Sequence, residues 1–107
     1  MNAPANLPWS EQFRIVGKEW NELDKAASLL EETKTLVLSQ KIAQLGDMPH
    51  NKAERIVKSS NEWMDYVTRL VEARSAANLK RVQMDYLKMK FQEWSSENAT
   101  RRAEMRL

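Results

Sequence analysis

The sequence predicts an all-α fold: a long antiparallel helical hairpin of the coiled-coil kind, whose second helix is longer than its first. The 107 residues include only two glycines, three prolines and no cysteine. Apolar residues alternate at spacings of three and four over two long stretches, which is the spacing of a helix–helix seam. The segment Gly46-Asp47-Met48-Pro49 separates the two stretches, and such glycine and proline punctuation is typical of a turn.

The first periodic stretch predicts a helix over residues 9–45. Residues 1–8 carry two prolines and no periodic pattern, so we expect a flexible N-terminal arm there. Among the aromatic residues of the stretch, Phe13 and Trp20 are expected in the core. The seam of this helix contains Trp9, Phe13, Val16, Trp20, Leu23, Ala27, Leu30, Val37, Leu38, Ile42 and Leu45.

The second stretch predicts a helix over residues 50–105, because no glycine or proline occurs after Pro49. The turn at 46–49 fits a glycine just past a helix end and a proline that cannot continue it. The alternative is a three-helix bundle with a break near residues 74–78, where the side chains are small and polar. The seam contains Ile56, Ser60, Trp63, Val67, Leu70, Ala73, Ala77, Lys80, Met84, Leu87, Phe91 and Trp94. A second apolar row contains Val57, Met64, Val71, Leu79, Val82, Tyr86 and Met89.

The two helices differ in length, and this difference predicts an overhang. Folding back at the turn places Trp9 opposite the region of Tyr86, so the end of the second helix extends beyond the first. A hairpin is also too thin to surround four tryptophans. We therefore expect residues 1–107 to form a single helical domain that self-associates, most simply as a twofold dimer completing a four-helix bundle.

The open end of the hairpin is the predicted interface with a protein. Large aromatic side chains dominate binding energy at interfaces, whereas Trp63, far from that end, is expected in the core. This pattern favours a non-enzymatic interaction, scaffold or adaptor protein. The predicted interface residues are Trp9, Leu87, Phe91 and Trp94.

Basic residues on the second helix support an alternative function. Arg74, Arg81 and Lys88 recur every seven residues and so share a face, and such a row can follow phosphates. The alternative is a nucleic-acid-binding accessory subunit, for example of the phage or mobile-element type, with contacts from Arg74, Lys80, Arg81, Lys88, Arg101 and Arg102. The competing structural interpretation is that these cations pair with the first helix, since residues 1–47 hold five Lys/Arg against seven Asp/Glu.

The sequence gives no indication of catalysis, a metal site or a cofactor. His50 is the single histidine and has no partner at metal-binding or catalytic spacing. Neither glycine belongs to a phosphate-binding loop. The longest apolar run, at residues 36–38, is too short to cross a bilayer, and the mean hydropathy is −0.68. We therefore expect no enzyme activity, no membrane association and a cytoplasmic location.

Overall fold

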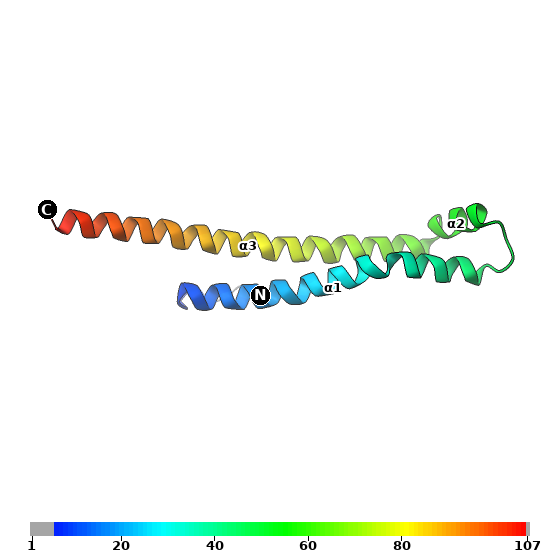
Figure 1. Cartoon of the computed structure of the whole chain (residues 1–107), viewed down its shortest axis with the longest axis horizontal. Coiled ribbons are helices and arrows are strands. Elements are labelled where there is room, and N and C mark those ends of the chain that lie inside the picture. The colour runs from blue at the N-terminus through cyan, green and yellow to red at the C-terminus, as the bar shows by residue number, and fades with distance from the viewer. Residues whose placement is uncertain (1–5, 107) are drawn as a thin grey trace. The chain divides into compact units, whose positions relative to one another are not determined.

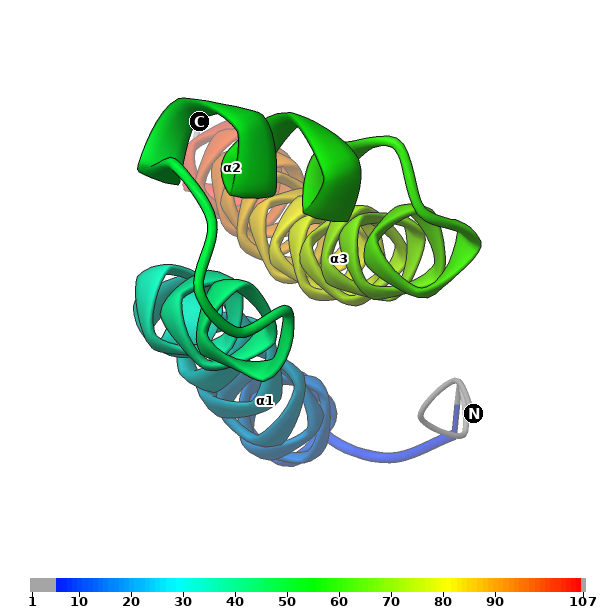
Figure 2. The same cartoon turned by 90° about the vertical axis from the view of Figure 1, so that its right-hand side faces the viewer.

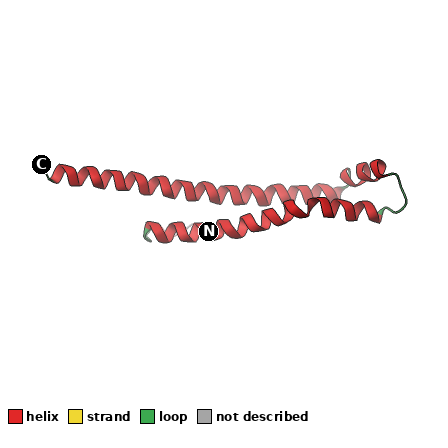
Figure 3. Ribbon diagram, viewed as in Figure 1, coloured by secondary structure: helices red, strands yellow, loops and turns green. Residues whose placement is uncertain are grey.

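A computed structural model describes residues 6–106, and the described chain is helical with no strand (Figures 1 and 3). It contains α1 (Trp9–Gln44), α2 (His50–Lys58) and α3 (Asn61–Met105). The predicted all-α class is thus confirmed. Residues 6–22 and 78–106 form one compact unit, called the terminal unit below, and residues 23–77 form the second, called the turn unit.

The helix α1 ends at Gln44, one residue before the predicted end at residue 45. Gly46 adopts a left-handed conformation with φ of +80°, which costs glycine little because it lacks a Cβ. Its N–H donates to the carbonyl of Ala43 at 3.2 Å and so satisfies one of the carbonyls that a helix end leaves free.

The predicted single helix over 50–105 is wrong, because the chain breaks at Ser59 and Ser60. The Ser60 hydroxyl donates to the Val57 carbonyl at 2.6 Å and accepts the N–H of Trp63 at 3.2 Å. One side chain therefore closes the end of α2 and caps the start of α3, a role for which serine is strongly preferred. Figure 2 shows α2 displaced from the axis of α3. The predicted alternative break near 74–78 is also wrong, since α3 is continuous there.

The break changes which face of α2 is buried. Extending the seam backwards from Trp63 through a continuous helix selects Ile56, but Ile56 is 41% exposed. As a separate helix, α2 buries Ala53 and Val57 instead, two residues that lie one turn apart on the same face. The assignment of Val57 to an outer row and Ile56 to the seam is therefore reversed.

The core of the turn unit forms around Val57, Trp63 and Tyr66. The two aromatic rings stack with centroids 5.5 Å apart and planes inclined by 18°. The predicted core position of Trp63, which is 6% exposed, is confirmed. Half-buried apolar residues pack against this cluster, namely Leu30, Val37, Leu38, Ile42, Val67 and Leu70.

Polar contacts fix the alignment of α1 with α3 in the turn unit. The Tyr66 hydroxyl donates to the Leu30 carbonyl at 2.6 Å and lies 3.2 Å from the Thr33 hydroxyl oxygen. Lys41 forms an ion pair of 2.9 Å with Glu62, at the opposite end of the unit from Asp24 and its partner on α3, Arg74. The α1 and α3 segments therefore run antiparallel within this unit.

The terminal unit has a thinner core. Val16 is 3% exposed, and a Cβ added at Gly17 would lie 3.5 Å from the Met84 methyl carbon, an ordinary contact. Trp20 is half-buried. The predicted core position of Phe13 is wrong, because its side chain is 39% exposed and lies only one turn from the start of α1, where few residues can surround it.

Candidate protein-interaction site

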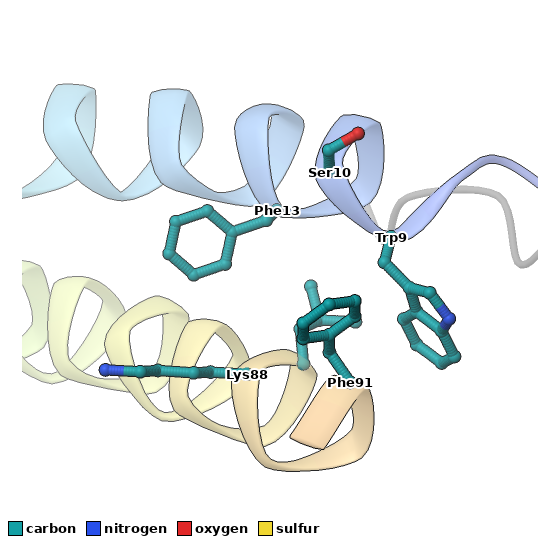
Figure 4. A pocket seen from close by; sticks show the side chains of 6 residues that line it. Trp9, Ser10, Phe13, Lys88 and Phe91 are labelled. Carbon is teal, nitrogen blue, oxygen red and sulfur yellow. The ribbon is translucent and has the colours of Figure 1, made fainter. Parts of the chain in front are cut away.

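An apolar groove of about 410 Å³ lies in the terminal unit, where α1 begins. On α1, Trp9 and Phe13 lie four residues apart and so share a face. On α3, Leu87 and Phe91 have the same spacing, and Ser10 and Lys88 complete the lining. In Figure 4 the Phe13 and Phe91 rings point into the gap between the helices, whereas the Ser10 hydroxyl points away from α3.

Two further side chains extend the aromatic surface. The Trp94 ring lies 6.1 Å from that of Phe91, at an angle of 32°. The Lys90 Nζ atom lies 5.6 Å from the ring centroids of both Trp9 and Tyr86. A cation at this distance is attracted to the face of a ring, so Lys90 draws the indole of Trp9 towards α3.

The four residues predicted for the interface therefore lie close together: Trp9, Leu87 and Phe91 line the groove, and Trp94 contacts Phe91. The exposed fraction is 45% for Phe91 and 48% for Trp94. Sequence reasoning missed Phe13, although its position four residues after Trp9 could have assigned it to the same surface. Trp9 lies about one turn further along α3 than its expected position opposite Tyr86, because α2 takes up residues that the prediction had paired with α1.

Beyond the groove, α3 continues to Met105. In Figure 1 its orange and red end continues past the blue start of α1. We call residues 92–106 the α3 extension. All of its side chains are exposed except Asn98, which is half-buried, and Met105 is 81% exposed.

The basic residues predicted to contact nucleic acid separate into two groups. Arg74 donates to Asp24 at 2.6 Å, to Ser28 at 3.2 Å and to Glu31. The two carboxylates, Glu31 first and then Asp24, raise the pKa of Arg74. Lys80 lies 2.6 Å from Glu19, and its hydrogen bond lowers the pKa of that carboxyl. Both cations thus hold α3 to α1. The exposed group consists of Arg81, Lys88, Arg101 and Arg102.

Metal-ligating residues, apolar helices and the single histidine are the other features that could indicate a site in the described residues. The described residues contain no group of three or more metal-ligating side chains, and none of their helices is long and apolar enough to span a membrane. The His50 Nε2 atom lies 3.6 Å from a Glu54 carboxylate oxygen on an exposed face of α2.

The second apolar row of α3 is exposed rather than buried. Six of the seven residues in this row lie on α3, and each of the six is more than half exposed. Two leucines of α1 are exposed to the same degree. The exposed residues are Met64, Val71, Leu79, Val82, Tyr86 and Met89 on α3, and Leu29 and Leu36 on α1.

Comparison with known proteins adds no relative from which a role could be transferred: no protein-family model, curated protein or solved structure matches this chain.

Proposed function

We propose that this chain is a non-enzymatic helical interaction protein, a scaffold or adaptor, that self-associates and binds a protein partner through its aromatic end. The observation that carries the proposal is the groove between Trp9, Phe13, Leu87 and Phe91, with Trp94 beside it. We further propose that α1 and α3 together make the helical hairpin that presents this groove.

The exposed aromatic rings of this groove supply apolar surface that a partner can cover. Phe91 and Trp94 leave nearly half of their surface to water, and each square ångström of apolar surface removed from water contributes about 25 cal/mol. Tryptophan in particular is enriched among the residues that dominate binding energy. The attraction of Lys90 for the Trp9 ring reduces the ordering that a partner must impose on this surface.

The test measures the solution mass of the chain and of two variants by light scattering at micromolar concentration. We expect a mass of at least twice the 12.5 kDa of one chain, and a lower mass for Trp94→Ala. The matched control is Val82→Ala, since Val82 is a 61% exposed apolar residue of the same unit on another face of α3. A monomeric wild-type chain, or equal masses for both variants, would contradict self-association through the aromatic end.

A second function, binding of nucleic acid as an accessory subunit, is favoured by the exposure of Arg81, Lys88, Arg101 and Arg102. The engagement of Arg74 and Lys80 in ion pairs reduces the available cations, so we place it second. Phosphate contacts make affinity fall steeply with salt. A gel shift at low salt that Arg101→Gln/Arg102→Gln abolishes would support this function, and no shift at low salt would end it.

A further inference from the structure

The α3 extension continues the face of α3 that α1 covers in the terminal unit. Leu87 and Phe91 contact the start of α1 through the groove. Trp94, Asn98, Arg101 and Met105 follow them at spacings of three and four, which keeps all of them on one helical face. In the described chain α1 begins at Trp9, so this face stays open from Trp94 onwards.

We propose that the occupant of this open face is the α3 extension of a second copy of the chain, docked antiparallel. This inference rests on the proposed function, because it names the molecule that covers the aromatic end. The α3 extension of the second copy lies where α1 of the first copy would continue beyond Trp9. Its last turn lies beside the groove of the first copy. A parallel copy cannot take this place, because its own α3 would continue before residue 92 into the space that α1 of the first copy already occupies.

The charges of the extension also favour this orientation. Its first half, residues 92–98, holds two glutamates, Glu93 and Glu97, and no lysine or arginine. Its second half, residues 99–106, holds three arginines and one glutamate. Antiparallel docking places the acidic half of each copy along the basic half of the other, whereas parallel docking aligns like charges, which repel.

One register satisfies both the apolar and the polar positions. When the two extensions are centred between Ala99 and Thr100, Trp94 lies opposite Met105 of the second copy. The same register places Asn98 opposite Arg101 of the second copy. The most exposed apolar side chain of the extension, Met105 at 81%, is thereby covered by an aromatic ring, a favourable contact for a thioether.

The absence of cysteine from the sequence allows the orientation to be tested by disulfide formation. Ser95 and Met105 of opposite copies lie nearly level in this register. Two copies of either residue lie about 13–17 Å apart along the helix axis, at ~1.5 Å per residue, which is beyond the reach of a disulfide. We therefore expect a mixture of Ser95→Cys and Met105→Cys chains to give a disulfide-linked dimer on oxidation, and neither variant alone to do so. The matched control pairs Met105→Cys with Ser39→Cys, an exposed serine of α1, and should give none.

A second experiment tests without cysteine whether opposite charges hold the two extensions together, while their orientation is decided by the disulfides. We expect Glu93→Arg/Glu97→Arg and Arg101→Glu/Arg102→Glu to be monomeric separately by light scattering, and to form a dimer when mixed one to one. Circular dichroism of each variant establishes that both remain helical.

The remaining outcomes each decide against the inference. A disulfide in Met105→Cys alone means parallel docking. A dimer without the mixed disulfide means another arrangement, such as the side-by-side four-helix bundle. A monomeric chain whose Trp94 is still required to hold a different protein overturns this inference and the self-association of the chain, and leaves standing the part of the proposed function that binds a protein partner through the aromatic end. A chain indifferent to Trp94→Ala in both respects overturns the inference and the whole proposed function together.

Discussion

The replacement Tyr66→Phe tests the alignment of α1 with α3 by removing a single oxygen atom. Tyr66 is 6% exposed, its hydroxyl donates to the Leu30 carbonyl at 2.6 Å, and the Thr33 hydroxyl oxygen lies 3.2 Å away. Phenylalanine keeps the ring that stacks on Trp63, so the variant loses the hydrogen bonds and little else. We expect a loss of about 1 kcal/mol in the free energy of unfolding, the usual net contribution of an intramolecular hydrogen bond.

The assay is urea unfolding followed by helical circular dichroism at one protein concentration, since self-association makes stability depend on concentration. A loss of about 1 kcal/mol lowers the urea midpoint by roughly 0.7 M if the slope is about 1.5 kcal/mol/M. The control is Tyr86→Phe, because Tyr86 is 54% exposed, and its midpoint should not move. An unchanged midpoint for Tyr66→Phe, or equal shifts for both variants, would refute the reasoning.

The other predictions concern the core, the half-buried ion pair between Glu19 and Lys80 and the two glycines. Trp63→Ala should cost about 3–5 kcal/mol, seen as a large fall in the urea midpoint or as loss of helical circular dichroism at 25 °C. The hydrogen bond with Lys80 lowers the pKa of Glu19 below the ordinary 4.5. The stabilisation of the fold by this ion pair is therefore complete above pH 4.5 and is lost as the pH falls through the lowered pKa. Urea midpoints measured against pH should show this loss, and Lys80→Met should remove that part of it. Gly46→Ala should lower the free energy of unfolding by about 1 kcal/mol because of its left-handed backbone. Gly17→Ala should raise it by up to about 1 kcal/mol, since its new methyl group only touches Met84. A higher urea midpoint for Gly46→Ala and a lower one for Gly17→Ala would contradict both assignments.

The periodicity of the sequence predicts the helices well and the interruption in them poorly. The spacing of three and four identifies both long helices, and Gly46 and Pro49 mark the turn between them. The break at Ser59 and Ser60 carries no such signal, because serine also occurs inside helices. It depends on one hydroxyl that serves two helix ends at once, and only the folded backbone brings those ends together.

The sequence predicts the aromatic residues of the candidate site better than it predicts which cations are exposed. Heptad position places Trp9 on the seam of α1 and Phe91 and Trp94 on the seam of α3, but it does not say which cations are exposed. The sequence left two interpretations open for Arg74, a phosphate contact or an ion pair with the first helix, and its guanidinium in fact pairs with Asp24 and Glu31. A long side chain at the edge of a seam can turn in either direction, and the carboxylates that decide the direction lie more than 40 residues away in the chain.

The contacts of Tyr66 and Arg74 have a consequence for tolerance to insertion. Both residues fix the alignment of α1 with α3 from within the turn unit, at a distance from the chain reversal itself. Asp47 is exposed, and Gly46 has no atom within 4 Å of the place of a Cβ. Because each doubling of a flexible loop costs only about 0.6 kcal/mol, we expect the connection at residues 46–48 to accept several added residues, or even a fused domain, while the two helices keep their pairing.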